Sequence, residues 1–197
     1  MGIGGIERGE RIVVIYFTSD EHYNHEGIIK YCKRPFQSVK EMNEAMIERF
    51  NSVVTPSDET WHGGDFAWNG AGSILPQLNG RHYLVLGNHD KRHLSSWEFC
   101  MFDKVLDVQN VKYYHQKIFL SHYAHAKWPG SHRGSFHVFG HSHGLFPGLG
   151  RSMDIGVDAH DFKPISFEEV VTRLESKEVD MENYAGEFYK GPEEPID

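Results

Sequence analysis

The chain has 197 residues, of which 20 are Lys or Arg and 28 are Asp or Glu, so its formal net charge is -8 with neutral histidine. This length suits one domain and can bury a core without disulfides or structural metals. The acidic balance argues against a protein that grips long nucleic acid with its whole surface, because phosphate backbones favour a basic face. The 14 histidines instead indicate site chemistry, because imidazole is a common metal ligand and acid or base at neutral pH.

Targeting signals are not evident in the sequence. The apolar run at 12–17 is far too short to span a membrane, and no signal-peptide cleavage pattern follows it. Ile6 stands where an N-myristoylation signal needs Ser or Thr. Cys32 and Cys100 lie far apart, which is typical of free thiols in a reducing compartment. The sequence therefore predicts a cytoplasmic protein without a membrane partner, and it leaves the oligomeric state open.

The predicted elements begin after a Gly-rich lead-in at 1–10. Residues 11–18 are β-branched and aromatic and predict a buried strand, and helical spacing of apolar residues predicts an amphipathic helix at 39–53. Short strands follow at 59–62, 81–86, 105–108, 111–115, 117–120, 136–139 and 152–157, with a helical turn at 74–78. A last helix begins at Ser166 and turns Val170, Val171 and Leu174 inward. These elements predict one α/β domain over 11–174 with a strand-rich second half, and the acidic stretch 175–197 is expected to be a weakly ordered tail.

Five of the predicted strands end in a small residue followed by Asp, Asn or His. In open α/β sheets, ligands gather beyond the carboxyl ends of the strands, so these five ends are expected to meet at one site. The side chains that they contribute are Asp20, His22, Asp65, Asn88, His122, His141 and His143. Oxygen and imidazole donors without thiolate suit Mn²⁺, Fe, Ni or Zn²⁺ bound for catalysis. Seven ligands are too many for one ion with open positions, but they fit two ions that share a carboxylate.

These side chains lie in motifs that carry a family resemblance. The motifs are Asp20-x-His22, Gly64-Asp65, Gly87-Asn88-His89-Asp90, Ser121-His122 and Gly140-His141-Ser142-His143. In order and rough spacing the sequence resembles the calcineurin-like metallophosphoesterases over about residues 12–174, and among them the small single-domain bacterial and phage members. The stretches 32–36, 156–158 and 164–166 support the narrower placement. The fold that this resemblance implies is of the α/β (α+β) type, a four-layer α/β/β/α sandwich of two mixed sheets flanked by helices.

The resemblance also implies a role for each motif residue. One metal ion would bind Asp20, His22 and His143, the other would bind Asn88, His122 and His141, and Asp65 would bridge them. A hydroxide between the metals would attack phosphorus in line. The imidazole of His89 would protonate the leaving oxygen, and Asp90 would orient that imidazole. We expect two divalent ions, with manganese favoured and iron, nickel or zinc as alternatives.

One departure from the family narrows the expected substrate. The Ser/Thr protein phosphatases of the family place a phosphate-binding Arg soon after the Gly-Asp motif, whereas the stretch 66–70 has none, and Asp90 stands where those enzymes have Glu. The sequence therefore favours a phosphodiesterase acting on a small phosphoester, in particular small or cyclic nucleotides. The alternative is a nuclease or nucleic-acid end-processing phosphatase. A catalytically inactive binding scaffold is disfavoured, because every ligand position is filled.

Substrate contacts are less clearly marked. Lys91 and Arg92 follow the Asn-His-Asp motif, and the loop at 123–135 contains His125, Lys127 and Arg133, so both segments are candidates for binding phosphate. A solvated helix start and an ordinary solvated loop explain them equally well. Two tryptophans flank the Gly-Asp motif, and we expect Trp61 in the core and Trp68 at the rim of the cleft.

Overall fold

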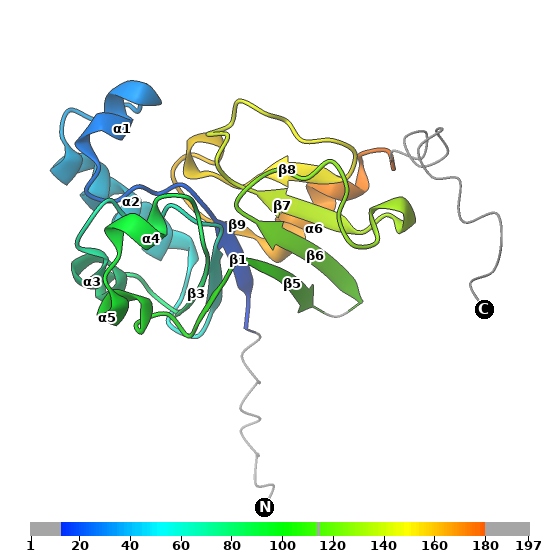
Figure 1. Ribbon diagram of the computed structural model, residues 1–197, viewed down its shortest axis with the longest axis horizontal. Coiled ribbons are helices and arrows are strands. Elements are labelled where there is room, and N and C mark those ends of the chain that lie inside the picture. The colour runs from blue at the N-terminus through cyan, green and yellow to red at the C-terminus, as the bar shows by residue number, and fades with distance from the viewer. Residues whose placement is uncertain (1–12, 114, 180–197) are drawn as a thin grey trace, which may run out of the picture.

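Two mixed β-sheets pack face to face (Figure 1). The computed structural model describes residues 13–113 and 115–179, so the predicted lead-in at 1–10 and most of the predicted tail lie outside the described residues. The first sheet has the order β4 (Lys104–Leu106), β3 (Arg81–Val85), β2 (Glu59–His62), β1 (Ile15–Thr18) and β9 (Ile165–Ser166). In it, β1 to β4 run parallel, and β9 runs antiparallel to β1.

The second sheet has the order β5 (Val108–Tyr113), β6 (Gln116–Ser121), β7 (Phe136–Phe139) and β8 (Ser152–Asp154). A hairpin joins β5 to β6, and β6, β7 and β8 are parallel. Parallel strands need a crossover between them, and the loop at 123–135 returns the chain from the end of β6 to the start of β7. This loop includes a 3-10 turn, η2 (Ser131–Arg133), and packs Trp128 against His137 on β7.

Helices cover the outer face of the first sheet. They are α1 (Glu26–Tyr31), α2 (Val39–Val53), α3 (Ala71–Ile74) with the 3-10 turn η1 (Leu75–Gln77), α4 (Asp90–His93) and α5 (Ser96–Phe99). The side chain of Ser38 caps α2 by accepting a hydrogen bond from the Glu41 amide, and Met42, Met46 and Phe50 form the buried stripe of this helix. Two mixed sheets flanked by helices are thus confirmed.

The core between the sheets is apolar and closely packed. Phe17 on β1 and Trp61 on β2 face Ile118 and Leu120 on β6, and α6 (Phe167–Glu175) adds buried side chains to the same cluster. Val170 and Leu174 of α6 are fully buried, as the sequence predicts. This core fixes the two sheets relative to each other and therefore fixes the strand ends that carry the motifs.

Element bounds agree with the sequence prediction where a segment is strongly patterned. The strands at 59–62 and 136–139 and the helix at 39–53 have the predicted bounds. The strand predicted at 152–157 ends at Asp154 and is followed by a 3-10 turn, η3 (Val157–Ala159). Two short helices, α1 and α5, were not predicted, since four to six residues carry too little periodicity, whereas α4 lies where a helix start was one interpretation of Lys91 and Arg92. No helix among the described residues is long and apolar enough to cross a membrane.

Candidate metal centre

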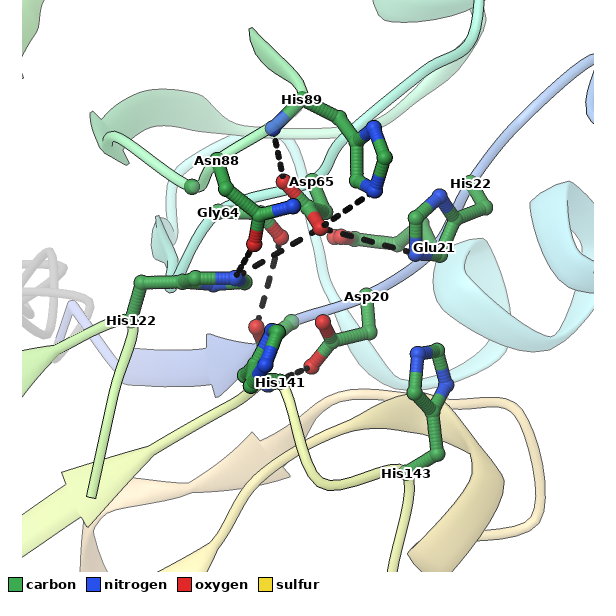
Figure 2. Close-up of polar contacts among 12 residues, drawn as sticks. Asp20, Glu21, His22, Gly64, Asp65, Asn88, His89, His122, His141 and His143 are labelled. Atoms are coloured by element: carbon green, nitrogen blue, oxygen red, sulfur yellow. Dashed lines mark hydrogen bonds and ion pairs between the residues drawn. The ribbon is translucent and has the colours of Figure 1, made fainter.

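The carboxyl ends of five strands from both sheets meet at one place (Figure 2). Strands β1, β2 and β3 lead into Asp20, Asp65 and Asn88, and strands β6 and β7 lead into His122 and His141. The hydrogen bonding between β1 and β2 continues beyond the two strands, where the Asp20 amide donates to the Gly64 carbonyl at 2.9 Å. The structure thus brings the motifs together at one site, as predicted.

Asp65 lies at the middle of the cluster. Its Oδ2 is 3.7 Å from His22 Nε2 on one side and 3.5 Å from His122 Nε2 on the other. Its Oδ1 accepts a hydrogen bond from the His89 amide at 2.9 Å, which fixes the rotation of the carboxylate. One oxygen therefore faces histidines of both predicted ligand sets, which is the position that a bridging carboxylate must take.

The first ligand group is formed by Asp20, His22 and His143, whose donor atoms lie within 4.8 Å of one another. Asp20 is completely buried, and its Oδ1 has no hydrogen-bond partner among the described residues, while Oδ2 accepts from the His141 amide at 2.8 Å. Burial raises the pKa of Asp20 to about 7 and lowers the pKa of His22 to about 2. A buried carboxylate oxygen without a partner beside a neutral imidazole is the donor set that a divalent cation satisfies.

The second ligand group is formed by Asp65, His122 and His141, again within 4.8 Å. His122 Nδ1 lies 2.9 Å from the Gly63 carbonyl, which assigns the ring proton to Nδ1 and leaves the lone pair on Nε2. That Nε2 is 3.0 Å from Asn88 Oδ1, so two lone-pair atoms face each other. A cation bound by both atoms removes their repulsion. The residues of both groups thus fit metal binding.

A charged network lies behind His143. Its Nδ1 is 2.7 Å from Asp158 Oδ2, and the same carboxylate receives Nε and Nη2 of the buried Arg34 at 2.8 Å each. Burial opposes the charged form of His143, but the hydrogen bonds to Asp158 and Cys32 outweigh it and raise its pKa to about 10. The Cys32 thiol, His143 and Asp158 also lie within 4.8 Å of one another. The sequence marked 32–36 and 156–158 as family signatures but did not reveal this contact.

A second buried network lies beneath the ligands and was missed by sequence reasoning. Glu21 Oε1 lies 2.6 Å from His62 Nδ1, and His62 Nε2 lies 3.1 Å from His82 Nδ1. Burial raises the pKa of Glu21 to about 8 and lowers the pKa of each of the two histidines to about 3. Burial thus disfavours the charged form of all three groups, and the network supports the Asp20-Glu21-His22 turn from below. The sequence signals for this network were the position of Glu21 within a motif and that of His62 beside one, from which a hydrogen bond of His62 to a carboxylate or a carbonyl was expected.

The backbone at the ligands is strained. Five of the seven predicted ligands, namely Asp20, His22, Asp65, His141 and His143, have φ between 47° and 66°. This left-handed region is unfavourable for residues other than glycine, and it persists only where the surrounding structure enforces it. Gly87 and Gly140 allow the close approach, since a Cβ on them would lie 2.2 Å from Asp65 Oδ1 and 2.0 Å from Ser19 Oγ, respectively.

The two residues expected to act in catalysis have different surroundings. His89 is half-buried at the mouth of the site, with its Nε2 4.0 Å from Asp65 Oδ2 and its ring 5.7 Å from that of His22. Asp90 is fully buried, and its carboxylate accepts hydrogen bonds from the amides of Asp65, Phe66 and Gly87. Asp90 therefore locks the loops after β2 and β3 together, and its orientation of the His89 ring stays a prediction.

Trp68 forms a wall beside His89. Its indole stacks between the imidazoles of His25 at 4.0 Å and His93 at 3.8 Å, and its centroid is 5.4 Å from that of His89. His25 Nδ1 and His93 Nε2 are buried without a hydrogen-bond partner among the described residues. Trp68 is thus at the rim of the site, and Trp61 is in the core, as the sequence predicts.

The predicted substrate-binding residues do not form one group. Lys91 pairs with Asp107 at 3.4 Å, and Arg92 is exposed on α4. His125 packs edge-on against Phe119, on the outer face of β6, and Lys127 lies in the same loop. Arg133 lines a separate groove at the opposite end of β6. The structure does bring Tyr123 to the centre, where its hydroxyl donates to Asn88 Oδ1 at 3.3 Å.

No protein-family model matches the chain. It is 31% identical over 177 residues to an uncharacterised protein of Methanocaldococcus jannaschii, covering 84% of this chain and 93% of that one. A crystal structure of a protein of unknown function from Aquifex aeolicus is similar with a TM-score of 0.67 and 25% identity, covering 83% of this chain and all of that one. A weaker similarity, with a TM-score of 0.44, 19% identity and coverage of 73% and 82%, is to a structure described as a novel archaeal phosphodiesterase.

Proposed function

We propose that the chain is a phosphodiesterase of the calcineurin-like metallophosphoesterase type, which works with two divalent ions and hydrolyses small or cyclic nucleotides. The observation that carries the proposal is the position of Asp65 Oδ2, between His22 Nε2 at 3.7 Å and His122 Nε2 at 3.5 Å. A single carboxylate oxygen shared by two histidine groups is the arrangement that two neighbouring ions require.

The arrangement of the donor atoms supports the binding of two divalent ions. Asp20, His22 and His143 would hold one, the group around His122 would hold the other, and Asp65 belongs to both. Bound divalent ions lower the pKa of water and neutralise charge on phosphoryl oxygens. Oxygen and imidazole nitrogen donors suit manganese, iron, nickel and zinc, and among these manganese is our first choice.

His89 is positioned to handle the proton. In hydrolysis, water adds to phosphorus, the bond from phosphorus to the leaving oxygen breaks, and that oxygen takes a proton. The half-exposed His89 ring faces the mouth of the site, its amide is tied to Asp65 Oδ1, and Trp68 limits its movement from one side. We assign protonation of the leaving oxygen to this imidazole.

The segment after Asp65 supports a diester over a phosphoprotein substrate. Phe66 and Ala67 are fully buried in the core under the helices, so this stretch contributes packing and not a cationic phosphate clamp. A diester carries one negative charge fewer than a monoester and has less need of such a clamp. A second candidate function, cleavage of nucleic acid, is favoured by one observation, a basic groove that is described in the next subsection.

A substrate panel tests the proposal. Metal-free protein is loaded with Mn²⁺, its metal content is measured, and it is assayed on bis-p-nitrophenyl phosphate, 2′,3′- and 3′,5′-cyclic nucleotides and p-nitrophenyl phosphate. We expect diester hydrolysis that Asp65→Asn abolishes. Loaded protein that cleaves no diester would overturn the proposal, and protein that retains only traces of metal would favour a binding scaffold instead.

A further inference from the structure

A groove of about 750 Å³ lies at the end of the second sheet that is opposite to the metal centre. One wall is the β5–β6 hairpin, and the other is the end of the 123–135 loop around η2. Its lining residues are Asn110, Lys112, His115, Gln116, Lys117, Pro129, Gly130, Arg133, Gly134 and Ser135. None of the ten is acidic, although the chain as a whole has a net charge of -8.

The positions of two lysines in this groove lower the stability of the hairpin and so are not explained by folding. Lys112 on β5 and Lys117 on β6 are directly opposite each other in the antiparallel register, and both are exposed. Like charges at directly opposed positions destabilise a hairpin. No ion pair joins either lysine or Arg133 to an acid within residues 13–113 and 115–179. Glu175 meets the groove residue Gln116, at 3.5 Å, but is not among the lining residues.

The groove is too far from the metal centre to share a phosphoryl group with it. Strand β6 begins at Gln116 and its end leads directly into the ligand His122. Lys117 and His122 are five residues apart, which is about 17 Å in an extended strand. A single small anion could therefore occupy one site or the other, but a chain of phosphates could contact both.

The chemistry of the lining favours such a chain. Lysine and arginine side chains and a histidine surround an open groove, and its neutral residues are amides, glycines, a serine and a proline. This lining contains no Phe, Tyr or Trp on which a nucleobase could stack, so it suits recognition of the backbone and not of a base. We propose that this groove binds the phosphate backbone of nucleic acid and thereby adds oligonucleotides to the substrates of the metal centre. Cleavage rests on the proposed phosphodiesterase function, whereas binding does not.

Binding is measured first, by fluorescence anisotropy of a fluorescein-labelled oligothymidylate at a series of salt concentrations. The groove variant is Lys112→Gln, Lys117→Gln and Arg133→Gln together. Each lost phosphate contact lowers the slope of log K against log salt by about 0.7 for single strands, so the slope is expected to fall by about 2. A matched control removes three charges that have acidic partners elsewhere, through Lys40→Gln, Arg49→Gln and Arg81→Gln, and is expected to keep the wild-type slope.

Two results of this assay would overturn the proposal. One is an equal slope in the groove variant and the wild type when both melt at the same temperature. The other is displacement of the oligonucleotide by oligoglutamate or by thymidine monophosphate at the same phosphate or carboxylate concentration, which identifies a site for acidic peptides or for single anions.

Cleavage is measured second, with manganese-loaded protein. The groove variant is expected to lose at least tenfold in kcat/KM on the oligonucleotide and to keep the wild-type kcat/KM on bis-p-nitrophenyl phosphate. Equal loss on both substrates contradicts a role of the groove in substrate binding. If the wild type cleaves no diester at all, the proposed function fails, and the anisotropy result still decides whether the groove binds nucleic acid.

Discussion

Arg34 and Asp158 form a bidentate ion pair across 124 residues of the chain, with both hydrogen bonds at 2.8 Å. The same guanidinium donates to the carbonyls of Asp20 at 2.7 Å and Glu21 at 2.8 Å. The same carboxylate meets His143 Nδ1 at 2.7 Å. This pair therefore joins the backbone at Asp20 and Glu21 to the side chain of His143. It orients this predicted ligand in the way that carboxylates commonly orient metal-binding histidines.

Asp158→Asn is expected to weaken metal binding. The amide does not hold the His143 ring as a carboxylate does and leaves Arg34 without its anion, so metal affinity should fall by about 10–100-fold. Titration of metal-free protein with Mn²⁺ measures this. Asp161→Asn is the control, because Asp161 is exposed and pairs with Arg49 outside the centre. Equal affinities of the two variants would show that the ion pair only stabilises the fold.

His89→Ala is expected to reduce turnover without loss of metal. A general acid typically raises the reaction rate by about 10²–10⁴-fold. The loss of rate should be largest for diesters whose leaving group is a poor alkoxide and smallest for bis-p-nitrophenyl phosphate. Steady-state kinetics on both substrates, with metal analysis of the same samples, provide the measurement. Loss of bound metal in this variant would mean that His89 is a ligand, and equal losses on both substrates would argue against proton donation.

Metal addition is expected to stabilise the protein, because it satisfies the buried Oδ1 of Asp20. At 100 times the dissociation constant, a ligand adds about 2.7 kcal/mol. For a domain of this size, 1 kcal/mol raises Tm by about 2–4 °C, so Mn²⁺ should raise the Tm of chelator-treated protein by roughly 5–11 °C. Thermal scans of Asp20→Asn should show a much smaller rise, whereas Asp103→Asn, which removes an exposed acid paired with Arg81, should behave as the wild type.

His137 is expected to make the fold sensitive to acid. It is fully buried between the Phe119 carbonyl and the His125 amide, and burial lowers its pKa to about 4 from an ordinary value of 6.5. Because the folded pKa is depressed, the unfolded chain binds the proton first as the pH falls. Stability is therefore complete above about pH 6.5 and is lost toward pH 4, on the order of 3 kcal/mol in all.

The variant His137→Gln tests this contribution. Urea unfolding at pH 7 and pH 5 should give a smaller loss of unfolding free energy for the variant than for the wild type, even though its stability at pH 7 is lower. Other buried histidines titrate in both proteins and cancel in the comparison. The same pH dependence in both proteins would show that His137 is not the responsible group.

The sequence predicted those parts of the molecule that depend on local pattern. Buried strands such as β2 and β7 stand out by composition, and the residues after them were placed at one site because parallel strands align their carboxyl ends. The helix α2 was predicted with its bounds, because 15 residues carry several turns of periodicity. Local pattern was therefore sufficient for the fold class and for the gathering of the ligands.

Long-range contacts were outside the reach of the sequence. Nothing in a local pattern pairs Arg34 with Asp158, or connects Glu21 through His62 to His82, since each partner comes from a different segment. The strained backbone was missed for the same reason. Residues such as Asp65 prefer a negative φ, and the surrounding loops impose the left-handed conformation on them.

The predicted metal ligands come from both sheets. Asp20, Asp65 and Asn88 follow strands of the first sheet, whereas His122, His141 and His143 follow strands of the second. A cation bound among them would therefore add a cross-link between the two sheets to the apolar packing and to polar contacts such as that of Arg34 with Asp158. In the metal-bound protein, amide protons of β1 and of β7 should exchange with solvent only when the whole domain unfolds. In the metal-free protein, each sheet should be able to unfold separately. Metal binding is thus expected to enlarge the cooperative unit in which this protein unfolds.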